Sequence, residues 1–142
     1  MMKLEDAKKI AEVALGKARE MELKPMSVVV LDDRAALRAV LTEDDASQQR
    51  AEIAFGKANG AVAFGMGTRG LAKRAERLAA FMAAAAVSVR GPFIPVTGGV
   101  LVRDQEGNVL GAVGLSGDKA DADEACAIAG IEAAGLVAQV GE

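Results

Sequence analysis

The chain has 142 residues, enough for one globular domain over residues 1–142, and its 17 basic and 20 acidic side chains give a formal net charge of −3. It contains no His, Tyr or Trp, which excludes Ser-His-Asp and Cys-His catalytic sites, His-based zinc sites and haem held by a proximal His or Tyr. The charges are interleaved in sign and aromatic residues are few, so we expect no nucleic-acid partner and no anionic membrane partner.

The single cysteine, Cys126, cannot form an internal disulfide, which fits a reducing compartment. Charged residues stand at the N-terminus where a signal peptide would be apolar, and the uncharged segment 78–89 is too short to span a bilayer. We therefore expect a cytoplasmic protein.

The first elements follow from hydrophobic periodicity. Apolar residues recur every three or four positions over residues 4–22, which predicts an amphipathic helix that ends before Pro25. The β-branched run 26–31 predicts a buried strand, and a polar turn leads to a second strand over 36–41. These two strands are expected to form a hairpin.

Two helices are predicted in the middle of the chain. Asp45 is expected to cap the first, which would run to about Phe64, and Thr68 is expected to cap the second, over 69–89. The second half of that helix, 78–89, is apolar on all sides and should therefore be buried on most of them. In a chain of this size, a partner subunit is the surface expected to cover it.

The last third begins with an extended connector, 91–96, because its two prolines exclude a helix. Gly98-Gly99 precedes a strand over 100–103, which turns back as a strand over 109–115, and a final helix is predicted over 119–139. The order is α-β-β-α-α-β-β-α. Because tight turns join antiparallel strands, we predict an α+β fold with a central antiparallel sheet flanked by helices.

Three polar or reactive features have two interpretations each. Arg50 and Lys57 lie seven residues apart on one helix face, which also fits a solvated surface. Gly98-Gly99 either presents backbone N–H groups to a carbonyl or carboxylate, or marks a bulge with positive φ. Cys126 lies among small apolar residues, which favours a packed side chain over a nucleophile.

Longer motifs resemble those of the GlcG/HbpS family. The segment 54–65 followed by Thr68-Arg69 resembles the family's GKA–TA–F–xxTR helix, and 28–32 resembles its V-x-V-x-D strand. This family is also called haem-degrading-domain-like and is related to the C-terminal domain of PduO. The glycine-rich second half matches the family pattern in chain order at Pro95, Gly98-Gly99, Asp104, Gly107, 111–117 and 123–127.

The resemblance implies a profilin-like α/β sandwich that forms homo-oligomers, from dimers up to octamers. It also implies a small-molecule ligand and a place in bacterial catabolism, and some family members bind haem or corrinoid-related ligands. The chain departs from the pattern at Ala35, at 42–46 and at Leu101, where the family carries a glycine, an R-M-D-G-A motif and a proline. The first two departures lie near the expected pocket, so the ligand's identity does not carry over.

We therefore predict a small-molecule-binding protein that binds a carboxylate or carbonyl compound without haem or another cofactor, and without a metal. Its pocket would lie between the helix that carries Lys57 and the strand start at Gly98-Gly99. Lys57 and Arg69 would attract the anion, and the amides of Gly98 and Gly99 would add neutral donors.

An enzymatic alternative stays open. In it the chain is a cofactor-free isomerase, tautomerase or lyase acting on a carbonyl acid, with Asp123, Glu124 or neutral Lys57 transferring the proton. Arg69 and backbone N–H groups would hold the developing oxyanion. The sequence does not separate catalysis from binding.

Two further alternatives are a haem-binding protein with a non-His ligand and a purely structural oligomer partner. The family's usual axial histidine is missing, so Met66, Met82 and Cys126 are the side chains that would have to bind iron.

Overall fold

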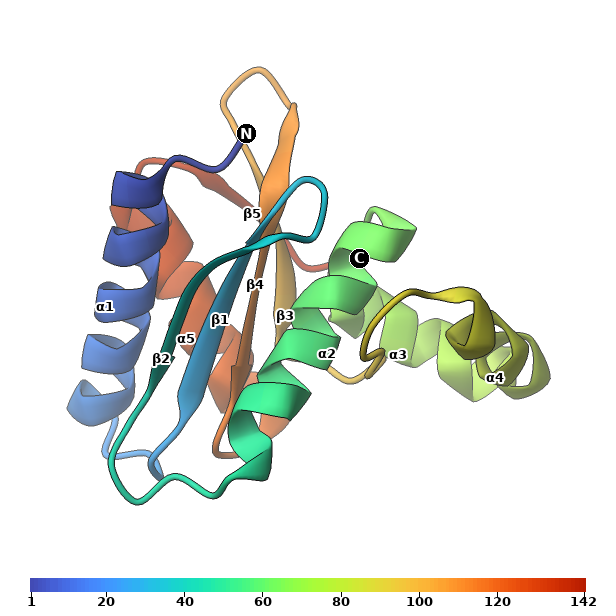
Figure 1. The fold of residues 1–142 in the computed structure, drawn as a ribbon, viewed down its shortest axis with the longest axis horizontal. Helices are drawn as coiled ribbons and strands as arrows, with labels where there is room; N and C mark the ends of the chain where they lie inside the picture. The colour runs from blue at the N-terminus through green and yellow to red at the C-terminus, as the bar shows by residue number, and fades with distance from the viewer.

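The computed structural model describes residues 1–142 and shows an antiparallel sheet with helices on both faces (Figure 1). The strands lie in the order β2-β1-β4-β3-β5, and every pair is antiparallel. The predicted α+β class is thereby confirmed, and the predicted elements occur in the predicted order. The structure divides one predicted helix in two and adds a short last strand. In chain order the elements are α1 (Leu4–Glu20), β1 (Ser27–Asp32), β2 (Leu37–Thr42), α2 (Gln49–Phe64), α3 (Thr68–Arg77), α4 (Ala79–Ser88), β3 (Gly99–Arg103), β4 (Val109–Ser116), α5 (Ala120–Ala133) and β5 (Val137–Gln139).

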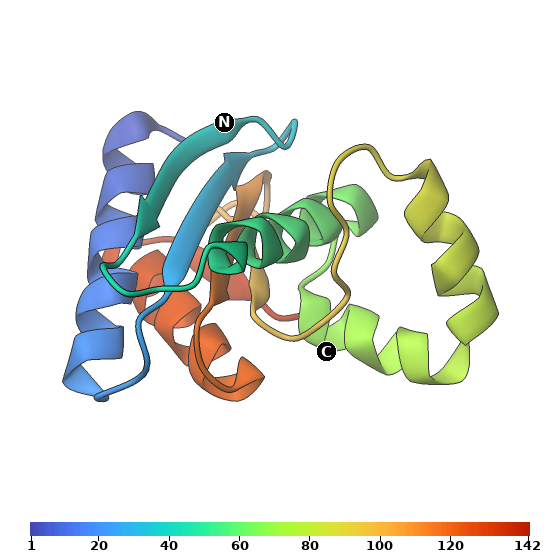
Figure 2. The ribbon, with the colours of Figure 1, turned by 60° about the horizontal axis from the view of Figure 1, so that its bottom comes forward.

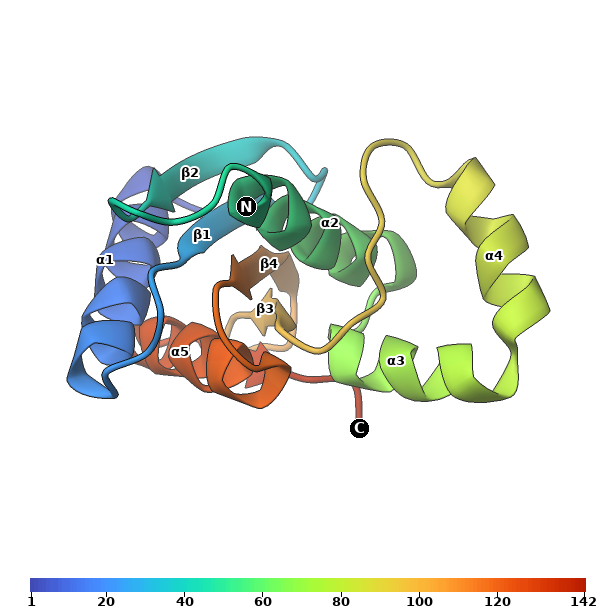
Figure 3. The same ribbon diagram turned by 90° about the horizontal axis from the view of Figure 1, so that it is seen from below.

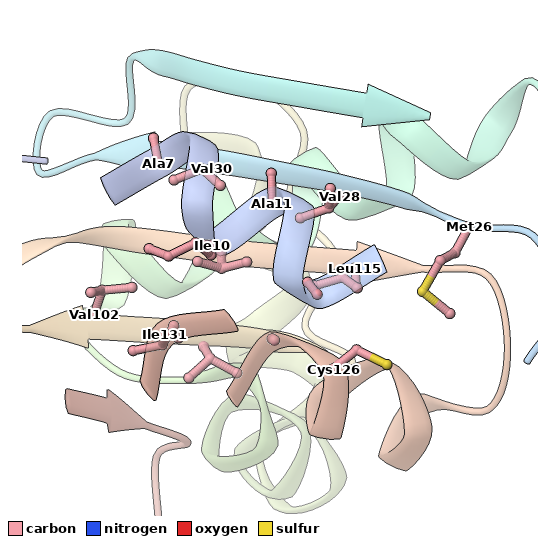
Figure 4. Close-up of a cluster of buried hydrophobic side chains, with 14 of the residues drawn as sticks. Ala7, Ile10, Ala11, Met26, Val28, Val30, Val102, Leu115, Cys126 and Ile131 are labelled. Carbon is pink, nitrogen blue, oxygen red and sulfur yellow. The ribbon is translucent and has the colours of Figure 1, made fainter. Parts of the chain in front are cut away.

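The larger hydrophobic core lies between the sheet and the helices α1 and α5 (Figure 4). Val28 and Val30 of β1 point into it, whereas Val29 and Leu31 point to the opposite face, toward α2. Side chains alternate between the two faces of a strand, so a strand covered by helices on both faces must be apolar throughout. This is the physical reason for the uninterrupted apolar run predicted as a buried strand.

Helix α2 lies against the other face of the sheet, close to β4. A Cβ added at Gly114 would overlap the backbone of Ala54, so this approach requires glycine. The close packing brings the middle of α2 to the end of β4 and thus positions Lys57 beside Leu115.

Helices α3 and α4 extend from the sheet as an arm (Figures 2 and 3). The predicted single helix over 69–89 is wrong at Leu78, where φ −127° and ψ 50° interrupt it. Helix α4 contacts α3 but no other element, and Met82 is its only buried residue. Phe81 is 56% exposed and Val87 88% exposed, so within one chain the apolar segment is uncovered.

The two predicted helix caps are also wrong. Asp45 adopts a left-handed turn with φ 68°, and α2 begins four residues later at Gln49. Thr68 is the first residue of α3 rather than its N-cap, because its hydroxyl accepts the Gly99 N–H at 2.8 Å and donates to the Gly99 carbonyl at 3.2 Å. The side chain therefore binds a neighbouring strand instead of its own helix.

The final helix is shorter than predicted. It ends at Ala133, and Gly135 in the left-handed region, with φ 75°, redirects the chain into β5, which pairs with β3. None of the helices has the length and apolar character needed to cross a membrane.

Candidate functional site

A cavity of about 340 Å³ opens where α2, the connector before β3 and the start of α5 meet at the end of β4. The elements around it can be followed in Figure 3. We call it the α2–α5 cavity. Its lining residues are Arg50, Ile53, Lys57, Ile94, Val96, Ser116, Asp118, Ala120 and Asp123.

The helix contributes Arg50, Ile53 and Lys57 to this cavity. Their spacing of three and four residues places them on one face of α2, as the sequence indicated for Arg50 and Lys57. At Lys57 this face meets the end of the central strand β4 rather than open solvent. The alternative of a solvated face therefore does not hold for Lys57, which is 3% exposed.

Lys57 ends in a buried ion pair. Its Nζ donates to the Leu115 carbonyl at 2.8 Å and to Asp123 Oδ2 at 3.2 Å. An ammonium has three N–H donors, so one remains without an assigned partner. Burial lowers the pKa of Lys57, the Asp123 carboxylate opposes this shift, and the positive charge of Arg50 adds to it.

Asp123 holds Lys57 from the first turn of α5. Its Oδ1 accepts the backbone N–H of Asp118 at 3.0 Å, so both carboxylate oxygens are engaged. Burial raises the pKa of Asp123, while Lys57 and the backbone N–H groups of Gly117 and Asp118 act against the shift. The pKa values of the two partners are thus displaced toward one another, which facilitates proton transfer between them.

Arg50 is the free cation of the cavity. Its Nη1 donates to Ser116 Oγ at 3.2 Å, and none of the seven ion pairs includes it. The nearby Asp118 carboxylate already accepts the N–H groups of Lys24 at 2.9 Å and Lys119 at 2.7 Å. Most guanidinium donors of Arg50 are therefore open to a ligand.

Arg69 lies outside this cavity. Its Nε donates to both oxygens of Glu124 at 3.1 Å, and its Nη2 donates to Glu124 at 2.9 Å and to Asp121 at 2.6 Å. The hydrogen bonds that Arg69 donates to Glu124 and then to Asp121 raise its pKa. Of the predicted site residues, the structure brings Lys57 and Asp123 together, and it pairs Arg69 with Glu124 elsewhere on α5.

The predicted glycine pair borders the site but does not present both amides to it. The Gly99 N–H is taken by Thr68. Gly98 has φ 125°, and a Cβ there would lie 2.7 Å from Lys57 Nζ, so this glycine leaves room for the ammonium group. Its role in the structure is therefore steric.

Cys126 is fully buried between α1 and α5 in the larger core (Figure 4). Burial, helped by the negative charge of Asp123, raises the pKa of its thiol to about 11, which keeps it protonated. The predicted packing role of this cysteine agrees with that position.

A second cavity of about 700 Å³ lies between the end of α2 and the arm helix α4. Eight of its eleven lining residues are hydrophobic, and Asn59 among the others donates to the carbonyls of Arg90 and Pro92. This arm cavity is bordered by Phe64 and Phe81 and holds no acidic side chain.

Sequence reasoning did not single out Ser116 or Asp118, and it left Arg50 as a surface residue. The seven-residue spacing of Arg50 and Lys57 was the only local signal for the cavity. Ser116 and Asp118 lie 66 and 68 positions beyond Arg50, so only the fold brings them together.

Comparison with known proteins gives a family. A model described as haem degrading protein HbpS-like matches residues 2–132. The chain belongs to this HbpS-like family. A comparison with curated proteins finds no match.

Solved structures share the fold of this HbpS-like chain. The PduOC–haem complex has 22% identity and a TM-score of 0.85 and covers 97% of this chain and 98% of its own. A double mutant of HbpS from Streptomyces reticuli has 28% identity and a TM-score of 0.79 over 93% and 86% of the two chains. The Klebsiella pneumoniae protein ORFY has 22% identity and a TM-score of 0.82 over 94% and 90%.

Proposed function

We propose that this protein binds a small compound with a carboxylate and a carbonyl group in the α2–α5 cavity, without haem. The observation that carries the proposal is an arginine without a carboxylate partner, Arg50, beside the buried pair of Lys57 and Asp123. Relative to the sequence-based prediction, Lys57 is kept as a ligand-binding residue and Arg50 takes the place of Arg69.

Both cations of the cavity retain N–H donors. Each oxygen of Asp123 and Asp118 already accepts one hydrogen bond from the protein, and none of these bonds comes from Arg50. Arg50 and Lys57 therefore keep unassigned N–H groups. A guanidinium binds a carboxylate through two parallel hydrogen bonds, and the remaining Lys57 N–H suits a carbonyl oxygen. The apolar side chains of Ile53, Ile94 and Val96 leave room for a short hydrocarbon part.

Haem, which is bound in the PduOC complex, does not fit the donors around the cavities. The common protein ligands of haem iron are His, Cys, Met and Tyr. Neither the α2–α5 cavity nor the arm cavity is lined by Cys or Met, and the chain has no His or Tyr. Cys126 is enclosed in the core, and Met82 is 4% exposed.

Isothermal titration with pyruvate, lactate and acetate tests the binding proposal. We expect pyruvate to bind and Arg50→Gln to weaken it by about tenfold or more, because a charge-assisted hydrogen bond contributes about 1.5–3 kcal/mol. Arg74→Gln, which changes an exposed arginine on α3 without an ion pair, is the matched control. Equal affinity for pyruvate in all three proteins, or no binding of any of the three acids, would contradict the proposal.

A haem titration tests the second half of the proposal. We expect only a broad absorption without a sharp Soret shift, since no suitable axial ligand lines a cavity. Stoichiometric binding at sub-micromolar concentration with low-spin iron would overturn this expectation.

We also propose that the protein forms a homo-oligomer through its arm. Helix α4 has no charged residue over Ala79–Ser88, and Phe81 and Val87 are largely exposed. Uncovered apolar surface of this kind marks an interaction site. Size-exclusion chromatography with light scattering should show an oligomer that Phe81→Asp reduces to a smaller species. A wild-type monomer would refute the proposal.

A further inference from the structure

We propose that Lys57 forms a Schiff base with the carbonyl carbon of a 2-oxo acid bound in the α2–α5 cavity. This inference rests on the proposed binding of a carboxylate by Arg50 and adds a covalent step to it. It assigns to the buried pair of Lys57 and Asp123 a chemical role rather than a purely structural one.

The geometry places one amine, that of Lys57, at the cavity and shields it from water. Lys57 is the only lysine that lines the α2–α5 cavity, and its side chain is 4% exposed. Gly98 leaves the space that Nζ occupies. Because Nζ is held by Leu115 and Asp123, it has a fixed position against the cavity wall.

The two cations converge although they start far apart on α2. Seven residues of helix separate the Cα atoms of Arg50 and Lys57 by about 10.5 Å along the axis. Their side chains nevertheless bond to adjacent residues of β4, Ser116 and Leu115. A ligand whose carboxylate is one bond away from its carbonyl therefore fits between the guanidinium and the amine.

The amine must lose a proton before it can attack, and the site supplies an acceptor for it. Desolvated lysines, and lysines next to another cation, are the ones that act as nucleophiles. Burial and the Arg50 charge lower the pKa of Lys57, and Asp123 Oδ2 lies 3.2 Å from Nζ. Asp123 is buried, and burial raises its pKa, so it can hold the proton that Lys57 gives up.

The step balances without an oxidant or reductant. One proton passes from Nζ to Asp123, the neutral amine forms a C–N bond with the carbonyl carbon, and a proton moves from nitrogen to oxygen to give the carbinolamine. The hydroxyl then takes the proton from Asp123 and leaves as water while the C=N bond forms. The product is an iminium ion paired with the Asp123 carboxylate, so the charge of the site is unchanged.

Reductive trapping tests the proposal on the unmodified protein. The protein is incubated with pyruvate and sodium cyanoborohydride, and the adduct is located by peptide mass mapping. We expect a saturable adduct at Lys57, about tenfold or more above that at Lys119, because Arg50 holds the acid beside Lys57 and the lowered pKa of Lys57 leaves more of its amine unprotonated. Lys119 is exposed and lies beside the cavity residues Asp118 and Ala120, so it is the internal control.

The variants separate the two proposals. Lys57→Arg should abolish the adduct, and Arg50→Gln should raise the pyruvate concentration that gives half-maximal trapping by about tenfold or more. If Lys57→Arg does not fold, as judged by circular dichroism, the position of the adduct in the peptide map of the wild-type protein decides whether Lys57 forms the Schiff base. Pyruvate binding without an adduct at Lys57 would refute the Schiff base alone, whereas the absence of pyruvate binding would refute both proposals. Equal adducts at Lys57 and Lys119 would show an unselective reaction and would also refute the Schiff base.

Discussion

Two cations, Lys57 and Arg69, form ion pairs with carboxylates of α5, and they differ in what surrounds them. Lys57 and Asp123 are 4% and 2% exposed in their side chains and line the α2–α5 cavity. Arg69 is 27% exposed and pairs with both Glu124 and Asp121 of the same helix. We call this partly solvated group at the rim of the molecule the rim pair. Lys57 has one carboxylate partner and lies beside a cavity, whereas Arg69 has two carboxylate partners and lies outside it.

The difference separates structural charges from available ones. A carboxylate on each side leaves Arg69 little affinity for another anion, because a ligand would have to displace Glu124 or Asp121. Lys57 faces a single carboxylate in a dry environment, where each charge depends strongly on its partner. We therefore expect the two pairs to respond differently to substitution. Substitution of the buried pair should lower both stability and ligand binding, and substitution of the rim pair should lower stability alone.

The largest effect is expected from breaking the buried pair. Lys57→Met leaves Asp123 buried without its cation, which should lower the free energy of unfolding by about 3–5 kcal/mol. Urea unfolding followed by far-UV circular dichroism measures it, since the chain has no Trp or Tyr for fluorescence.

A double variant provides the control for this experiment. Lys57→Met combined with Asp123→Leu removes both charges, and apolar replacement of a whole buried pair is often neutral or stabilising. We expect it to regain most of the lost stability but not pyruvate binding. A double variant as unstable as the single one would show that the lost stability comes from packing rather than from the unpaired charge.

A smaller effect is expected at the rim. Arg69→Met should lower the free energy of unfolding by about 1–2 kcal/mol, because the pair is partly solvated but its hydrogen bonds are charge-assisted. Pyruvate affinity, measured by titration calorimetry, should stay within about twofold of wild type, well below the tenfold that 1.4 kcal/mol represents. A large loss of affinity in this variant would return Arg69 to the site, where the sequence-based prediction had placed it.

The smallest effect is a difference in pH response between two buried aspartates. Burial alone would raise the pKa of Asp32, but N–H groups of Ala36 and Arg34 and the side chain of Arg38 lower it below 3.8. Asp32 therefore stabilises the fold above pH 3.8, and this contribution is lost as the pH falls through the folded-state pKa. Asp123 has a raised pKa, so its titration acts with the opposite sign.

Carboxyl ¹³C NMR on aspartate-labelled protein measures both midpoints. We expect Asp32 to titrate below 3.8 and Asp123 above it. In urea unfolding, the advantage of wild type over Asp32→Asn should shrink as the pH falls below 3.8. A stability difference that does not change with pH would show that Asp32 acts only through its shape.

Much of the fold was predictable because it depends on neighbours along the chain. The periodicity of α1, the β-branched run of β1 and the two tight turns are local features, and they sufficed for the α+β class and the antiparallel sheet. The break at Leu78 was missed because no Gly or Pro marks it. The strand β5 was missed because Gly135 was read as part of a helix, although its left-handed conformation ends one.

The candidate site was predictable only in part. Lys57 and Asp123 were candidates from their motifs, and the structure joins them across 66 positions of sequence. Arg50 was visible as a partner of Lys57 by helical spacing, but its role depended on the end of β4. In the sequence Arg69 looked equally suited to bind an anion, because the two carboxylates that pair with it lie 52 and 55 residues further on and no local pattern reveals them.

The sequence by itself determined which chemistries are absent and which segments are apolar. The lack of histidine removes a whole class of ligands, and no packing can restore it. Tertiary structure alone decided which cation is free to bind a ligand. Carboxylates at the start of α5 reach across to these cations and supply two partners to Arg69, one to Lys57 and none to Arg50. A cation without an internal carboxylate partner is the one most available to an external anion.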